Sequence, residues 1–171
     1  LKLLKKRERG RRMKTDFQKL YDEAFRLLGK RTPLKTDCGV LCEKSCCRGD
    51  EKTGMLLFPF EKTTLRVEEK DGVRLAVCSG SCERDERPLS CRIFPFFPTV
   101  SDDGKITVSL DYRGFFSCPL VRHCDDVRFS FRFLHRVRLL GELLSADEDC
   151  LGFLKEVTKE IEFEKALLET K

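Results

Sequence analysis

The sequence lacks any long apolar run, and it also lacks the motifs of several common enzyme classes. No stretch approaches the ~20 apolar residues that a bilayer-spanning helix needs, which predicts that no segment crosses a membrane. There is no Gly-Lys phosphate loop, no G-x-S-x-G elbow, no H-E-x-x-H and no G-x-G-x-x-G after a strand. Only two histidines occur in 171 residues, which does not favour a His-rich catalytic metal site. These absences argue against an enzyme and leave no catalytic residues to name.

The start of the chain is charged rather than apolar. Residues 1–14 hold eight Lys and Arg against Glu8 alone, a net charge of +7, whereas the whole chain sums to 34 − 29 = +5. No apolar segment of the ~7–15 residues of a secretory signal lies there. We therefore expect a cytoplasmic protein in which a basic N-terminal arm, residues 1–14, precedes a nearly neutral single domain, residues 15–171.

Cysteine, by contrast, is abundant. The chain has ten cysteines in 171 residues. This share is below the ~8–10% that is typical of a short secreted disulfide scaffold. In a reducing compartment, clustered thiols indicate a metal site more often than disulfides. Metal binding is therefore the leading interpretation, with disulfides and unpartnered thiols as the alternatives.

Helical periodicity marks both ends of the domain. Residues 15–30 place apolar side chains on one face, with Thr15 as the expected N-cap. Two further helices are predicted over 127–170, and Ser145 is expected to cap the second of them. The domain is thus expected to begin and end with helices.

Between these helices the pattern changes to short β-type runs separated by charged or glycine-containing turns. The expected strands are 55–60, 64–70, 73–78 and 105–112. They belong to a Cys-rich core over residues 38–119. We expect an α+β fold, a small Cys-rich and metal-stapled domain with short strands and one hydrophobic core.

The first cysteine group is Cys38-x3-Cys42-x3-Cys46-Cys47. Thiolates bind soft or borderline metals, and several within ten residues converge on one site if the loop folds back. Zinc ribbons and ferredoxins mostly use two-residue gaps, so this spacing does not name the metal. Adjacent Cys46 and Cys47 cannot easily both face one small ion. We expect one of them to bind the metal while the other packs or serves a second centre.

The second group is Cys78-x3-Cys82, followed by the segment RPLSCRIFP around Cys91. Two prolines fix the backbone on either side of Cys91, which helps to hold a ligand in place. Arg87 and Arg92 flank this thiol. They either pair with the negative charge of several thiolates sharing a metal or form weak surface ion pairs with the acidic residues nearby.

The Cys-rich loop, the stretch RPLSCRIFP and the later Cys118-Pro119 together resemble the YkgJ-like family of zinc- or iron-chelating domains, which includes the Cys-rich part of flagellin lysine-N-methylases. The resemblance covers residues 38–119. It implies a metal-chelating protein whose cofactor is an iron–sulfur cluster or Zn²⁺. By position it implies seven metal ligands, which are Cys38, Cys42, Cys46, Cys47, Cys82, Cys91 and Cys118. The chain departs from the family in the three-residue gaps of its first cysteine run.

Two other functions stay open beside metal chelation. One is S-adenosylmethionine-dependent methylation of protein lysines, as in the methylase branch of the family. The other is a zinc-stapled adaptor that binds nucleic acid or protein through the basic arm and through Arg128, Arg132 and Arg136. A solvated helix face explains these arginines more simply, so a protein partner is favoured over nucleic acid.

The thiols themselves yield a geometric expectation. Cys124, beside His123, and Cys150, at the start of the last helix, are weaker candidates, and Cys150 is expected in the core or at the surface. More than four clustered thiols give an iron–sulfur cluster a slight preference over zinc. A single centre is expected to gather Cys38, Cys42, one of Cys46 and Cys47, Cys91 and Cys118.

Overall fold

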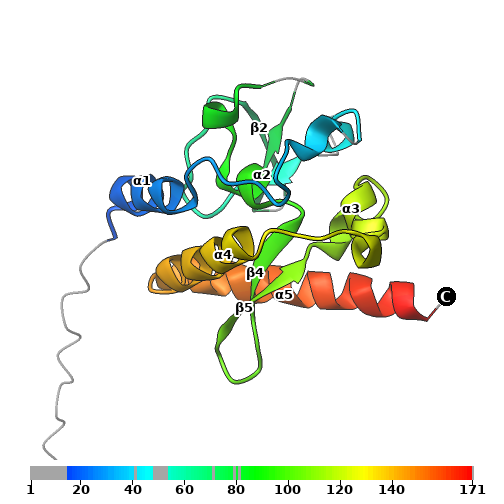
Figure 1. Cartoon of the computed structure of the whole chain (residues 1–171). Coiled ribbons are helices and arrows are strands. Elements are labelled where there is room, and N and C mark those ends of the chain that lie inside the picture. Colours follow the sequence, from blue (N-terminus) through cyan, green and yellow to red (C-terminus); the bar gives the residue numbers. More distant parts are fainter. Residues whose placement is uncertain are drawn as a thin grey trace, which may run out of the picture.

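The computed structural model describes residues 15–40, 42–47, 54–70, 72–78, 80 and 82–170. The chain has an α+β fold with one helix before the strands and two long helices after them, as the periodicity predicts (Figure 1). The basic arm expected over residues 1–14 lies outside the described residues. No helix in the described part of the chain is long and apolar enough to span a membrane.

Helix α1 spans Phe17–Leu28. The prediction of Thr15 as its N-cap is wrong, because the carboxylate of Asp16 accepts a hydrogen bond from Lys19 N at 3.3 Å. The Thr15 hydroxyl instead donates to Asp147 Oδ2 at 2.5 Å. Asp147 in turn caps the last helix. The hydroxyl therefore joins the two ends of the fold.

The strands form two small antiparallel sheets. The first has the order β1-β3-β2, built from Met55–Leu56, Arg66–Lys70 and Val73–Val77. The second is a hairpin of β4, Phe96–Val100, and β5, Ile106–Leu110, in which Pro98 faces Val108. Proline is tolerated in β4 because this strand has a single partner.

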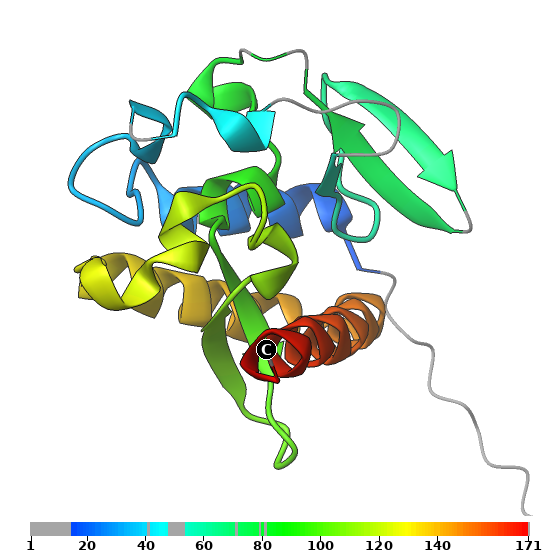
Figure 2. The same cartoon turned by 90° about the vertical axis from the view of Figure 1, so that its right-hand side faces the viewer.

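Besides the 3₁₀ turn Arg84–Glu86, one strand and one α-helix between β3 and β5 were not foreseen. They are β4 and the short helix α2, Leu89–Ile93. The expected strands 55–60 and 64–70 are also shorter than predicted. In both views of the fold, α2 lies between two layers (Figures 1 and 2). One layer contains the 38–47 loop and the three-stranded sheet, and the other contains the hairpin and the C-terminal helices.

The two predicted C-terminal helices are α4, Phe131–Leu144, and α5, Glu148–Glu169. Ser145 lies at the end of α4 and does not cap α5, contrary to the prediction. Asp147 takes that position because its carboxylate accepts from two amides at the start of α5, those of Asp149 and Cys150, at 3.0 and 3.1 Å. A further short helix, α3, spans Pro119–Arg122.

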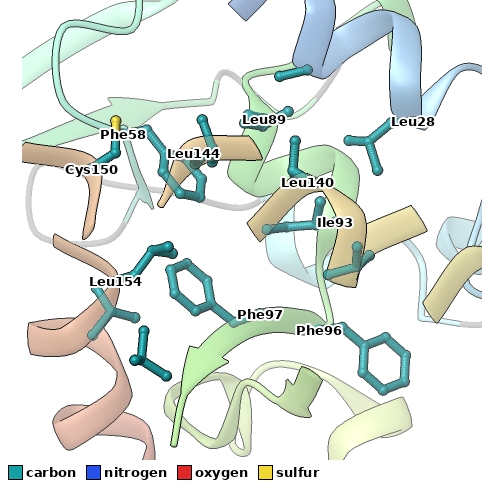
Figure 3. Close-up of a cluster of buried hydrophobic side chains, with 14 of the residues drawn as sticks. Leu28, Phe58, Leu89, Ile93, Phe96, Phe97, Leu140, Leu144, Cys150 and Leu154 are labelled. Atoms are coloured by element: carbon teal, nitrogen blue, oxygen red, sulfur yellow. The ribbon is translucent and has the colours of Figure 1, made fainter. Parts of the chain in front are cut away.

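The main hydrophobic core joins α1, α2, β4, α4 and α5 (Figure 3). Leu89 and Ile93 of α2 are fully buried in it. Residues four apart share one face of a helix, so Cys91, midway between them, lies on the opposite face of α2. The core therefore fixes α2 and turns Cys91 away from the apolar side.

Helix α4 approaches the hairpin closely at Gly141. A Cβ atom on this glycine would lie 2.5 Å from Pro98 Cβ and 2.7 Å from Ile106 Cγ2. Only a residue without a side chain fits this contact. Gly152 in α5 differs, since a Cβ there would meet nothing within 4 Å.

Candidate metal centre

One cavity of about 380 Å³ collects half of the cysteines of the chain. The thiols that line it are Cys46, Cys47, Cys78, Cys82 and Cys91. They come from three separate segments, namely the turn Ser45–Cys47, the connection after β3, and helix α2. The fold thus brings together residues that are far apart in the sequence.

Helix α2, which carries Cys91, is held at its start by a buried carboxylate. Glu61 is 1% exposed, and it accepts hydrogen bonds from Leu89 N at 2.6 Å and from Phe58 N at 3.1 Å. Burial raises the pKa of Glu61 to about 7, although these two amides oppose the shift. Nothing in the sequence pattern singled out Glu61, because its role depends on a contact 28 residues away.

The two arginines beside Cys91 have different roles. Arg87 interacts with Cys82, and its charge also acts on Cys47. Burial lowers the pKa of Arg87, but Cys82 and the other acidic groups around it outweigh burial and hold the value above its ordinary range. Arg87 thus lies near the thiols of Cys82 and Cys47, and its pairing with thiolate charge stays a prediction.

Arg92 belongs to the scaffold. Its Nε donates to the carbonyl of Arg87 at 3.1 Å and its Nη2 to the carbonyl of Asp85 at 2.6 Å. Its guanidinium carbon lies 4.5 Å from the ring centroid of Phe25. Arg92 therefore stabilises the turn before α2 and the contact with α1.

The adjacent pair Cys46 and Cys47 is electrostatically unequal. A hydrogen bond from Cys46 lowers the pKa of Cys47 to about 6, with burial acting against it and Arg87 acting in the same direction. The same contact raises the pKa of Cys46, and burial adds to that rise. The lower pKa of Cys47 favours ionisation of Cys47 over that of Cys46. A thiolate is the form that binds a metal.

Cys91 lies in the same electrostatic environment. Burial raises its pKa, and the negative charges of Cys47, Cys82 and Cys78 raise it further. Burial likewise raises the pKa of Cys78. Thiols that hinder one another's ionisation in this way are relieved by a bound cation, which reverses the local electrostatics.

Three other cysteines form a second group outside the cavity. Cys118 precedes α3, is 5% exposed and packs against Cys38 in a small apolar cluster. The Cys42 thiol donates to the carbonyl of Cys38 at 3.7 Å. Burial raises the pKa of Cys38 to about 11, followed by the effects of Asp37, Cys42 and Cys118.

The single centre expected from the sequence stays a prediction, although its expected members fall into two groups. Cys91 lines the cavity, whereas Cys118 is held with Cys38 by the buried residues of α3, Leu120 and Val121. The positions of Cys91 and Cys118 follow from two different hydrophobic clusters, which spacing alone could not reveal.

Among the cavity thiols, Cys78 is the one missing from the predicted ligand set. Its three-residue gap to Cys82 repeats the gap between Cys38 and Cys42, and that signal could have identified it. Cys150 is a core thiol, fully buried 3.8 Å from Tyr21 Oη.

The thiols are gathered but not in coordination geometry. Within the described ranges, no three or more His, Cys, Asp or Glu side chains form a group that could hold a metal ion as they stand. The Ser90 hydroxyl, also at the cavity, is buried and has no hydrogen-bond partner among the described residues. The cavity therefore carries polar groups that nothing in this part of the protein satisfies.

Comparisons of the chain with protein-family models, with curated proteins and with solved structures find no match. The resemblance carried by RPLSCRIFP therefore stays a prediction from the residues. The function has to be argued from the cavity and its thiols.

Proposed function

We propose that the protein binds a metal, as an iron–sulfur cluster or Zn²⁺, through thiolates at the cavity. One observation carries this proposal. Cys47, Cys78, Cys82 and Cys91 converge from three segments beside the guanidinium of Arg87. A metal bound by these four sulfurs would link the three segments to one another.

The chemistry of this donor set fits the proposed cofactors. Four cysteine thiolates are a common ligand set for structural zinc and for iron–sulfur clusters. Four thiolates on one divalent ion leave a net charge of −2, which Arg87 partly neutralises. The cavity of about 380 Å³ has room for a cluster as well as for a single ion.

Binding would draw the sulfurs closer together. Each ligand sulfur lies ~2.3 Å from a bound zinc ion, a geometry that the thiols do not have as they stand. The turn Ser45–Cys47 would therefore close on α2 when the metal binds. Such a coupling between metal binding and folding is usual for small cysteine sites. We also propose a cytoplasmic location, where the thiols stay reduced.

The test compares Cys91→Ser with Cys150→Ser in protein purified without oxygen. Cys91 lines the cavity, whereas Cys150 is buried in the core away from it. We expect Cys91→Ser to lose most of the cavity metal and Cys150→Ser to keep the wild-type content, measured as iron, zinc and sulfide per chain. Equal losses in the two variants, or a wild-type protein without metal, would overturn the proposal.

A further inference from the structure

We infer that the chain holds two separate four-thiolate centres, with the adjacent Cys46 and Cys47 divided between them. The first centre is formed by Cys47, Cys78, Cys82 and Cys91. The second is formed by Cys38, Cys42, Cys46 and Cys118, and it takes a single Zn²⁺ ion. This inference rests on the proposed function and extends it, because it assigns a second metal site to Cys46 at the edge of the cavity and to three thiols outside it.

The loop before Cys46 is folded back on itself. Lys44 N donates to the carbonyl of Gly39 at 3.1 Å, and Ser45 N donates to the carbonyl of Cys42 at 3.0 Å. Glu43 and Lys44 have positive φ angles of 49° and 57°, which are costly for residues other than glycine. This reversal lies between Cys42 and Cys46. It makes the three-residue gap compatible with both thiols reaching one ion.

The groups that act electrostatically on the two adjacent cysteines differ. Besides Cys47, the thiols that act on Cys46 are Cys42 and Cys38. Besides Cys46, the groups that act on Cys47 include Arg87 and Cys78. Both cysteines belong to the 3₁₀ turn Ser45–Cys47, in which successive side chains are rotated by about 120°. One residue can therefore face the second group while the next faces the cavity.

The surroundings of the second group suit a structural ion. Cys118 lies in an apolar cluster with Leu120 and Val121, and Leu34 and Phe115 pack against it. Cys46 lines the cavity, whereas Cys38, Cys42 and Cys118 do not. A closed site of four thiolates is the usual form of structural zinc, whereas a site with open space beside it leaves room for a larger group. The second ion would tie the 38–47 loop to the start of α3.

The number of sites is tested on the wild-type chain. Metal-free protein is titrated with Zn²⁺ alone under reducing conditions, and native mass spectrometry counts the bound ions. We expect saturation at two ions per chain. Saturation at one ion would overturn the second centre and leave the proposed function standing, whereas no binding would overturn both.

Variants assign the ions to the two groups. We expect Cys118→Ser and Cys91→Ser each to bind one ion, and the control Cys124→Ser, outside both groups, to bind two. Two ions in Cys118→Ser would overturn the assignment. Loss of both ions in a variant that keeps the wild-type circular dichroism spectrum would contradict separate sites. If Cys118→Ser does not fold, Cys42→Ala takes its place in the experiment.

Discussion

Glu61 is the residue whose position links the hydrophobic core to the thiols. Its carboxylate holds the first amide of α2, and burial raises its pKa from 4.5 to about 7. At a pH between these two pKa values, the folded protein keeps a proton on Glu61 that the unfolded chain has lost. The free energy of unfolding therefore falls as the pH rises. The shift corresponds to about 3 kcal/mol of unfolding free energy.

We therefore expect wild type and Glu61→Gln to respond differently to pH. The glutamine variant has no proton to lose at this position, although it gives up one of the two hydrogen bonds accepted by Glu61. Urea unfolding from pH 4.5 to 7.5 should show the wild type losing up to about 3 kcal/mol more than the variant. Parallel pH profiles would mean that Glu61 ionises normally in the fold.

The sequence indicated which types of residue line the cavity, but it did not indicate which cysteines lie together. The cysteines and Arg87 were identifiable because thiolates and a flanking cation have a chemical meaning in any fold. The division between Cys91 and Cys118 was not identifiable, since it depends on which hydrophobic cluster holds each segment. The helix caps show a similar limit, because Thr15 and Ser145 are plausible caps that lie one and two residues before the carboxylates that cap instead, Asp16 and Asp147.

At the scale of elements, the contact between α4 and the hairpin depends on Gly141. Alanine would gain about 1 kcal/mol of helix propensity, but its Cβ would overlap with Pro98 and Ile106. Overpacking of this kind costs about 1–3 kcal/mol. We expect Gly141→Ala to lower the free energy of unfolding.

Gly152→Ala is the matched control in the neighbouring helix. The Cβ there meets nothing within 4 Å, so the substitution should stabilise the protein by about 0.5–1 kcal/mol. Chemical unfolding of both variants measures the difference. If Gly141→Ala stabilised the protein as much as Gly152→Ala, the close contact between α4 and the hairpin would be wrong.

The elements themselves were predictable where their pattern was long. The outer helices follow from apolar residues at regular spacing, and the hairpin strand over 106–110 follows from alternation. Helix α2 spans only Leu89–Ile93, and β4 is buried at every position. An element this short, or a strand without alternation, gives no periodic signal, so tertiary packing decides its structure.

For the whole molecule, the core is larger than the short strands suggested. It is built from α1, α2, β4, α4 and α5, and none of the cavity thiols belongs to it. If metal-bound thiolates link the Cys38 loop to the β region, we expect metal removal to open both together. Because the core does not contain the cavity thiols, we expect only the layer with the 38–47 loop and the three-stranded sheet to open.

Hydrogen exchange before and after chelation under reducing conditions tests this expectation. Amides in 42–47 and 73–78 should exchange faster once the metal is removed, because few apolar contacts hold them. Amides in α4 and α5 should keep their protection. Equal loss of protection everywhere would show that the metal stabilises the whole domain as one unit, and no change anywhere would contradict a metal link between the segments.

The order in which the chain is synthesised matters for the cavity thiols, because α2, which carries Cys91, belongs to a core that includes later helices. Cys47, Cys78, Cys82 and Cys91 have all been made once synthesis reaches residue 91, but the core that supports α2 also needs α4 and α5. At ~5–20 residues per second, a ribosome needs roughly 4–16 s to extend the chain from Cys91 to the end of α5. During that interval the nascent thiols have no finished scaffold. If the cavity thiols bind a metal, we expect the finished site to form only after α5 has been made.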